Sequence, residues 1–179
     1  MRLQVVELRT TVADEPGADL PRALLADLVA GLGRGSWELN LVLVDDDAMA
    51  DLNARHYGGE GVTDVLSFSY LEEAGRGEPQ LAAGEGGAAA DLWLPVAPAG
   101  QPALAGEIVL ALDYVEDRCR RRAWDRTTEL ALLVVHGALH VLGWRHDDAE
   151  QTRAMRAREA EQLARHGLHH PLLETGGGA

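Results

Sequence analysis

The chain has 179 residues, 46% hydrophobic and 25% charged, which is the balance expected of one globular domain with a sizeable core. Its formal charge of -13 argues against a general affinity for nucleic acid, because phosphate binding needs a positive field. No segment approaches the ~20 apolar residues of a membrane span, and the N-terminus lacks a signal-peptide pattern. The single cysteine, Cys119, leaves no partner for an internal disulfide. We therefore expect a cytoplasmic protein.

The first part of the chain alternates strands and helices. Period-two alternation predicts a strand over 2–10, helical spacing of leucines predicts a helix over 20–32, and alternation returns in a strand over 37–44. Three aspartates, Asp45 to Asp47, offer caps for a short helix over 48–56. After a glycine-rich loop, a buried strand is predicted over 64–68.

The second part begins with residues 71–103, where Gly, Ala, Glu and Pro dominate and little periodicity remains. This composition predicts a flexible surface insertion. Further elements are expected in the order strand 106–112, helix 113–123, helix 127–142 and helix 148–165. The mixture favours a small α+β domain with about four strands in a mixed sheet and about five helices. The three histidines that follow, His166, His169 and His170, fall in a polar tail and are expected to be solvated.

Basic residues gather in one place despite the acidic total. The cluster consists of Arg118, Arg120, Arg121, Arg122 and Arg126, with Trp124 among them. Such a patch can dock a polyanion, and Arg118, Arg121 and Arg122 are candidate RNA-binding residues. The alternative is a solvated helix face, and the sequence leaves both interpretations open.

The segment that carries chemistry contains His136, His140 and His146. The first two are four residues apart on a helix that is apolar almost all the way round, so they share one face of a buried helix. Gly143 can adopt the left-handed conformation that ends a helix, which would return His146 towards the other two. The alternative is three unrelated histidines among the seven in the chain. Two unpaired imidazoles on a buried helix would be costly, which favours a shared ligand.

Three converging imidazoles predict one zinc ion per chain. Zinc prefers nitrogen and sulfur ligands in a tetrahedron, and three protein ligands leave one position open for chemistry. Structural zinc sites usually fill all four positions, commonly with thiolates, and this chain has one cysteine. A carboxylate from Asp147 or Asp148 could in principle complete a closed site.

The spacing is similar to the zinc helix of metzincin proteases, His-Glu-x-x-His-x-x-Gly-x-x-His. Here Gly137 follows the first histidine, where a peptidase needs glutamate as general base. The sequence therefore argues against a peptidase. It still predicts a zinc helix and turn like those of metzincins.

A closer resemblance is to the YbeY family of bacterial endoribonucleases, whose signature resembles His-Gly-x-Leu-His-x-x-Gly-Tyr-Asp-His. Two further blocks agree in order: 63–68 reads Thr-Asp-Val-Leu-Ser-Phe, as in the family, and 106–109 resembles its Gly-Asp-Ile-Val strand. Leu52 and Asn53 also fit. The resemblance extends from about residue 37 to 165. It implies a zinc-dependent endoribonuclease for single-stranded RNA that acts in ribosomal RNA maturation and ribosome quality control, with ribosomal RNA or ribosomal particles as partners.

Several positions depart from the family pattern. The arginine that the family carries six residues before the Thr of Thr-Asp-Val-Leu-Ser-Phe, and that is linked to its nuclease activity, is Tyr57 here. Arg55 or Arg145 could supply the missing cation. Two alternatives follow: a non-catalytic ribosome-assembly factor that keeps the zinc site, or a metallohydrolase of another substrate. The domain expected is a single catalytic unit over 1–170, with a disordered tail over 171–179.

Overall fold

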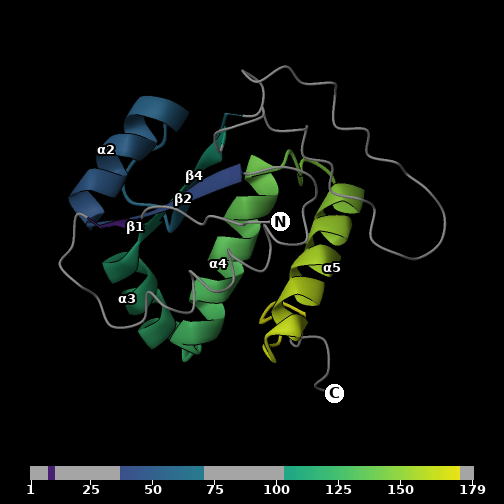
Figure 1. Ribbon diagram of the computed structural model, residues 1–179. Helices are drawn as coiled ribbons and strands as arrows, with labels where there is room; N and C mark the ends of the chain where they lie inside the picture. Colours follow the sequence, from purple (N-terminus) through teal and green to yellow (C-terminus); the bar gives the residue numbers. More distant parts are fainter. Residues whose placement is uncertain (1–7, 11–36, 71–102, 174–179) are drawn as a thin grey trace.

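The computed structural model describes residues 8–10, 37–70 and 103–173 (Figure 1). In these ranges it contains four strands and four helices. They are β1 (Leu8–Thr10), β2 (Trp37–Val44), α2 (Asp46–Tyr57), β3 (Val65–Ser69), β4 (Ala103–Ala111), α3 (Leu112–Arg122), α4 (Arg126–Val141) and α5 (Ala149–Arg165). The predicted small α+β domain is confirmed; the helix predicted over 20–32 lies outside the described residues.

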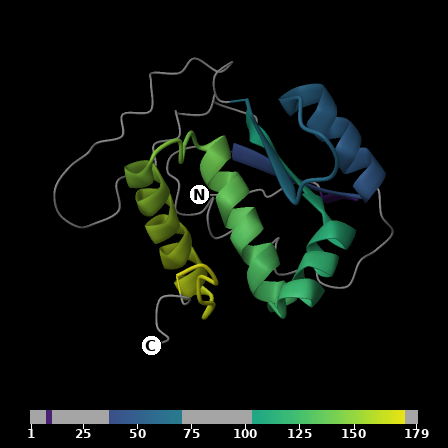
Figure 2. The same cartoon turned by 180° about the vertical axis from the view of Figure 1, so that it is seen from behind.

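The four strands form one mixed sheet in the order β1-β2-β4-β3. Strands β1, β2 and β4 run parallel, whereas β3 is antiparallel to β4. Alternate residues of β4 face opposite sides, so Ile108 and Leu110 join the larger core while Val109 and Ala111 join a smaller one. Helix α2 covers the smaller core through Met49, and α4 covers the larger one. Both views show α4 between the sheet and α5 (Figures 1 and 2).

Helix α4 is the central element of the domain, since it contacts the sheet on one side and both α3 and α5 on the others. Its N-terminus is capped by Asp125, whose carboxylate accepts the Thr128 N–H at 2.7 Å. Gly137 allows close approach to the sheet: a Cβ there would lie 2.8 Å from Ile108 Cγ2 and 2.9 Å from Ser67 Oγ. The helix is therefore held at a fixed distance from β3 and β4, and this fixes the direction of its histidines.

Two predictions about β-structure need correction. Strand β4 begins at Ala103, three residues earlier than the predicted start, because its backbone pairs in parallel with β2 from Trp37 onward. Residue 103, predicted to belong to a flexible insertion over 71–103, is therefore part of β4, and residues 71–102 lie outside the described ranges. Strand β3 was expected to be buried, but it ends the row of described strands and only Leu66 is fully covered.

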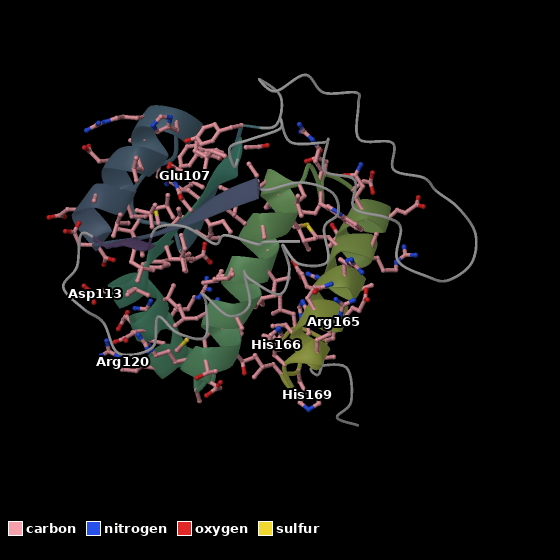
Figure 3. All side chains as sticks on the ribbon, in the orientation of Figure 1. Glu107, Asp113, Arg120, Arg165, His166 and His169 are labelled. Atoms are coloured by element: carbon pink, nitrogen blue, oxygen red, sulfur yellow. The ribbon has the colours of Figure 1, made fainter. Side chains whose placement is uncertain are left out.

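The tail after α5 also differs from the prediction. Residues 166–173 fold into turns against α5, with Leu168 packed on the larger core. His170, expected to be solvated, is buried, and its Nε2 lies 2.8 Å from the carboxylate of Glu159, which satisfies the buried ring. His169, one residue earlier, is exposed (Figure 3). In the described part of the chain, no helix has the length and apolar character needed to cross a bilayer.

Candidate metal centre

The three predicted ligands come together at the C-terminal end of α4. One nitrogen from each of His136, His140 and His146 lies within 4.8 Å of the other two. The ring centroids are 4.5, 5.4 and 5.0 Å apart for the pairs 136–140, 136–146 and 140–146. Gly143 has a φ of 91°, as the predicted chain reversal requires, and this brings His146 back to the helical pair. The structure thus joins three imidazoles that the sequence spaced over ten positions.

His140 presents Nε2 to the centre of the group. Its Nδ1 lies 3.0 Å from the carbonyl oxygen of Trp144, and a carbonyl can only accept, so Nδ1 carries the proton. Burial, together with the neighbouring His136 and His146, lowers the pKa of His140 to about 4. The ring is therefore neutral at pH 7, and its Nε2 lone pair is available to a cation.

His136 is oriented in the same way by a carboxylate. Its Nδ1 lies 2.7 Å from Oε1 of Glu159, a buried residue of α5. Burial alone would raise the pKa of Glu159, but hydrogen bonds from His136 and His170 outweigh it and lower the pKa to about 2. An ionised carboxylate only accepts, so His136 donates from Nδ1 and also turns Nε2 inward.

The donor set suits a metal ion. The Nε2 atoms of His136 and His140 are 3.0 Å apart, and two Nε2 lone pairs that face each other at this distance repel unless a proton or a cation lies between them. A shared cation removes this repulsion: two nitrogens at ~2.0–2.1 Å from a tetrahedral zinc are about 3.3 Å apart. His146 supplies a third nitrogen from the exposed side.

Neither of the carboxylates considered as a fourth ligand belongs to the histidine group. Asp148 caps α5, accepting N–H groups from Glu150 and Gln151. Asp147 is exposed, with Oδ2 3.9 Å from the Arg145 guanidinium. Within the described ranges, the group able to hold a metal consists of the three histidines alone. A metal held by these three histidines would receive no fourth ligand from the residues that the structure describes.

The histidines lie where two cavities meet. The larger, about 770 Å³, opens towards α2 and β3 and is lined by all three histidines with Asn53, Tyr57, Ser67, Ser69, Arg145 and others. The smaller, about 300 Å³, lies towards α3 and α5; His136, His146 and Glu159 line it together with Arg118, Arg122, Trp124 and Arg156. His136 and His146 therefore face both cavities, and His140 faces the larger one.

Tyr57, which stands at the family arginine position, and the two candidate cations Arg55 and Arg145 occupy different places. Tyr57 lines the larger cavity, and its hydroxyl donates to the carbonyl oxygen of Ser67 at 2.7 Å. Arg55 forms an exposed ion pair with Asp51 one turn earlier on α2 and lines neither cavity. Arg145 lines the larger cavity, and its side chain is 71% exposed. Of the two arginines, Arg145 is the one beside the histidines.

The arginines of α3 are not equivalent. Arg118 forms ion pairs with Asp64 and Glu129, and its side chain is largely covered. Arg121 pairs with Asp117 on the exposed face of α3. Arg122 lies over the Trp124 ring, with its guanidinium carbon 4.7 Å from the centroid, and lines the smaller cavity. Arg122 is thus the member of the predicted RNA-binding set with both exposure and a position beside the histidines.

Sequence reasoning missed Glu159 and His170. One signal was present: Met155, Glu159, Gln162 and Leu163 are buried and share one face of α5 at helical spacing. A glutamate within such a stripe must have a buried partner. The partner, His170, could not be identified from spacing because it lies beyond the end of the helix.

The chain is similar to known proteins of one family. A model of the family described as "Endoribonuclease YbeY" matches residues 20–167. The Endoribonuclease YbeY of Salinispora tropica is 36% identical over 162 residues, covering 86% of this chain and 92% of that protein. That of Moorella thermoacetica is 38% identical over 157 residues, covering 88% and 90%. The solution structure of TM1509 from Thermotoga maritima shares the fold, with a TM-score of 0.50 and 22% identity over 97% of this chain and 99% of that one.

Proposed function

Because this chain belongs to the endoribonuclease YbeY family, we propose that it is a zinc-dependent endoribonuclease acting on single-stranded ribosomal RNA. The observation that carries this proposal is the convergence of three imidazole nitrogens within 4.8 Å. Their partners, Trp144 O and Glu159, turn the helical pair inward. Ribosomal RNA maturation and quality control would bring the enzyme to ribosomal particles in the cytoplasm.

The proposed ligands are His136, His140 and His146, arranged on a metzincin-like helix and turn. Together these three imidazoles would hold a zinc ion, which would supply a Lewis acid for phosphodiester hydrolysis. The protein's own contribution is orientation: hydrogen bonds at both Nδ1 atoms fix the tautomers of the helical pair. The proposed catalytic domain is a single unit over 1–170, and residues 171–173 continue its C-terminal turn.

Charge on the scissile phosphate needs a cation from the protein. We assign this role to Arg145 in preference to Arg55, because Arg145 lines the cavity that contains all three histidines. Arg55 pairs with Asp51 outside that cavity. For backbone contacts along the RNA, Arg122 and Arg121 are the exposed candidates. Arg118 would act indirectly, through its ion pairs with Asp64 and Glu129.

The test uses purified protein on a single-stranded RNA and on a hairpin of matched length, with and without a chelator. We expect about one zinc per chain by elemental analysis and cleavage of the single strand that chelation abolishes. His140→Ala should lose the zinc and reduce cleavage at least ~100-fold, since even residues that only support a ligand are worth 10–100-fold. The control is His169→Ala, at an exposed position outside both cavities. Cleavage that survives chelation and His140→Ala would contradict the proposal.

A second candidate is a ribosome-assembly factor that keeps the metal but does not cleave. The observation that favours it is Tyr57, which occupies the family arginine position and donates its hydroxyl to Ser67. Co-sedimentation of zinc-loaded protein with ribosomal particles, without cleavage of their RNA, would support it. Hydrolysis of another substrate is less favoured. For a peptide, the glutamate required after the first histidine would meet Ile108 and Ser67 at Gly137.

A further inference from the structure

The carboxylate of Glu159 lies between the proposed metal centre and the C-terminal turn. Its Oε1 is 2.7 Å from Nδ1 of His136, and its Oε2 is 2.8 Å from Nε2 of His170. Both of its oxygens are therefore engaged by imidazoles, one on each side. Figure 3 labels His166 and His169 at the end of α5, on the turn that leads into His170.

The backbone N–H of Leu172, at the end of this chain of contacts, determines the direction of the hydrogen bonds. The backbone N–H of Leu172 donates to Nδ1 of His170 at 3.2 Å, so that nitrogen is unprotonated. The proton of a neutral His170 ring is then on Nε2, which donates to Glu159. The chain of contacts runs from the Leu172 amide through His170 to Glu159, and Glu159 accepts from His136. The backbone of the C-terminal turn thus selects which nitrogen of His170 faces the carboxylate.

Burial makes this arrangement costly to disturb. The side chains of His170 and Glu159 are 1% and 5% exposed, so water cannot replace a lost partner. If His170 stopped donating, one oxygen of Glu159 would be left without a partner. The carboxylate would then be free to rotate away from His136.

We propose that His170 and Glu159 are positioning residues for the metal centre, through which the turn over 166–173 fixes the orientation of His136. The inference rests on the proposed metal site. Metal-ligating histidines commonly donate their second nitrogen to a carboxylate, and such supporting contacts are worth 10–100-fold in metal affinity. What is particular here is a second buried histidine, behind the carboxylate, contributed by the segment after the last helix.

The test separates hydrogen bonding from packing at position 170. His170→Met fills similar space without an N–H donor, whereas His170→Gln retains one. His169→Met is the matched control at an exposed neighbour. Zinc dissociation constants are measured by competition with a chromophoric chelator, at a temperature where the metal-free variants are folded by circular dichroism. We expect His170→Met to weaken zinc binding ~10–100-fold, His170→Gln to recover much of the loss, and His169→Met to match wild type.

A second variant guards against misfolding at position 170. Glu159→Gln keeps the shape but cannot accept from both imidazoles, so it should also weaken zinc binding. In the metal-free protein, ¹H–¹⁵N spectra of the rings should show His136 protonated on Nδ1 in wild type and a changed tautomer balance in Glu159→Gln. Wild-type zinc affinity in folded His170→Met and Glu159→Gln would overturn the inference, even if RNA cleavage is intact. Tight zinc binding without RNA cleavage would instead count against the proposed function alone.

Discussion

The sequence contains two clusters of like side chains, the arginines of 118–126 and the histidines of 136–146. In the folded chain, the histidines lie close together and the arginines lie apart. The histidines converge until their nitrogens lie within 4.8 Å. The arginines separate: Arg118 enters an ion-pair network with Asp64 and Glu129, and Arg121 pairs with Asp117 on the surface. Arg122 lies over Trp124 beside the smaller cavity.

The difference comes from burial and from the supply of counter-charges. Helix α4 is covered on nearly all sides, so His136 and His140 have few partners besides each other and the residues that orient them. Helix α3 is exposed along one face in a protein of formal charge -13, where carboxylates are plentiful. Proximity of arginines in an acidic chain is thus weak evidence for a binding patch, whereas a histidine pair on a buried helix is strong evidence for a ligand.

The largest expected effect is at Arg118, because its covered side chain holds two carboxylates in an ion-pair network. Arg118→Ala would leave the carboxylates of Asp64 and Glu129 without their cation, and the Glu129 side chain is 3% exposed. We expect the free energy of unfolding to fall by about 3 kcal/mol, the cost of breaking a buried ion pair from one side. Urea denaturation measures it.

The control for that loss is Arg121→Ala, which breaks an exposed pair four residues apart on the same helix. It should change the free energy of unfolding by no more than about 0.5 kcal/mol. Equal losses for the two variants would show that the arginines do not differ in the way described.

Much of this fold was predictable because its signals are local. The strand over 37–44 was predicted with the bounds that β2 has, and α4 shifted by one residue from the predicted 127–142. The histidine triad was predictable for the same reason, since helical spacing and a glycine stop determine it. What could not be predicted depends on contacts between distant segments. Glu159 reaches His136 across 23 positions, and Arg118 reaches Asp64 across 54.

The position of the histidines depends on how closely α4 approaches the sheet, and Gly137→Ala tests that distance. On an isolated helix, alanine would be favoured over glycine by about 1 kcal/mol. Here the new Cβ would lie 2.8 Å from Ile108 Cγ2, and overpacking of this kind costs about 1–3 kcal/mol. We expect a net loss of stability of about 1 kcal/mol by thermal or urea unfolding.

Ala154→Gly is the matched control for that substitution, because residue 154 is an exposed position within α5. It should lose about 1 kcal/mol through helix propensity alone. If Gly137→Ala instead raised the free energy of unfolding by as much as Ala154→Gly lowers it, α4 would not approach β4 as closely as described.

The smallest expected effect is on RNA affinity. It distinguishes a direct contact between an arginine and a phosphate from the long-range electrostatic field of the protein. Arg122 lines the smaller cavity, whereas Arg120 lies on the outer face of α3 with 74% of its side chain exposed (Figure 3). Both substitutions to alanine change the net charge equally, so a purely long-range field would weaken RNA binding equally. If Arg122 neutralises one phosphate, Arg122→Ala should bind single-stranded RNA a few-fold more weakly and reduce the slope of log affinity against log salt by about 0.7. Arg120→Ala should leave that slope unchanged. Binding is measured on metal-free protein so that the RNA stays intact. Equal slopes for the two variants would mean that the exposed arginines of α3 form a solvated helix face and no RNA-binding patch.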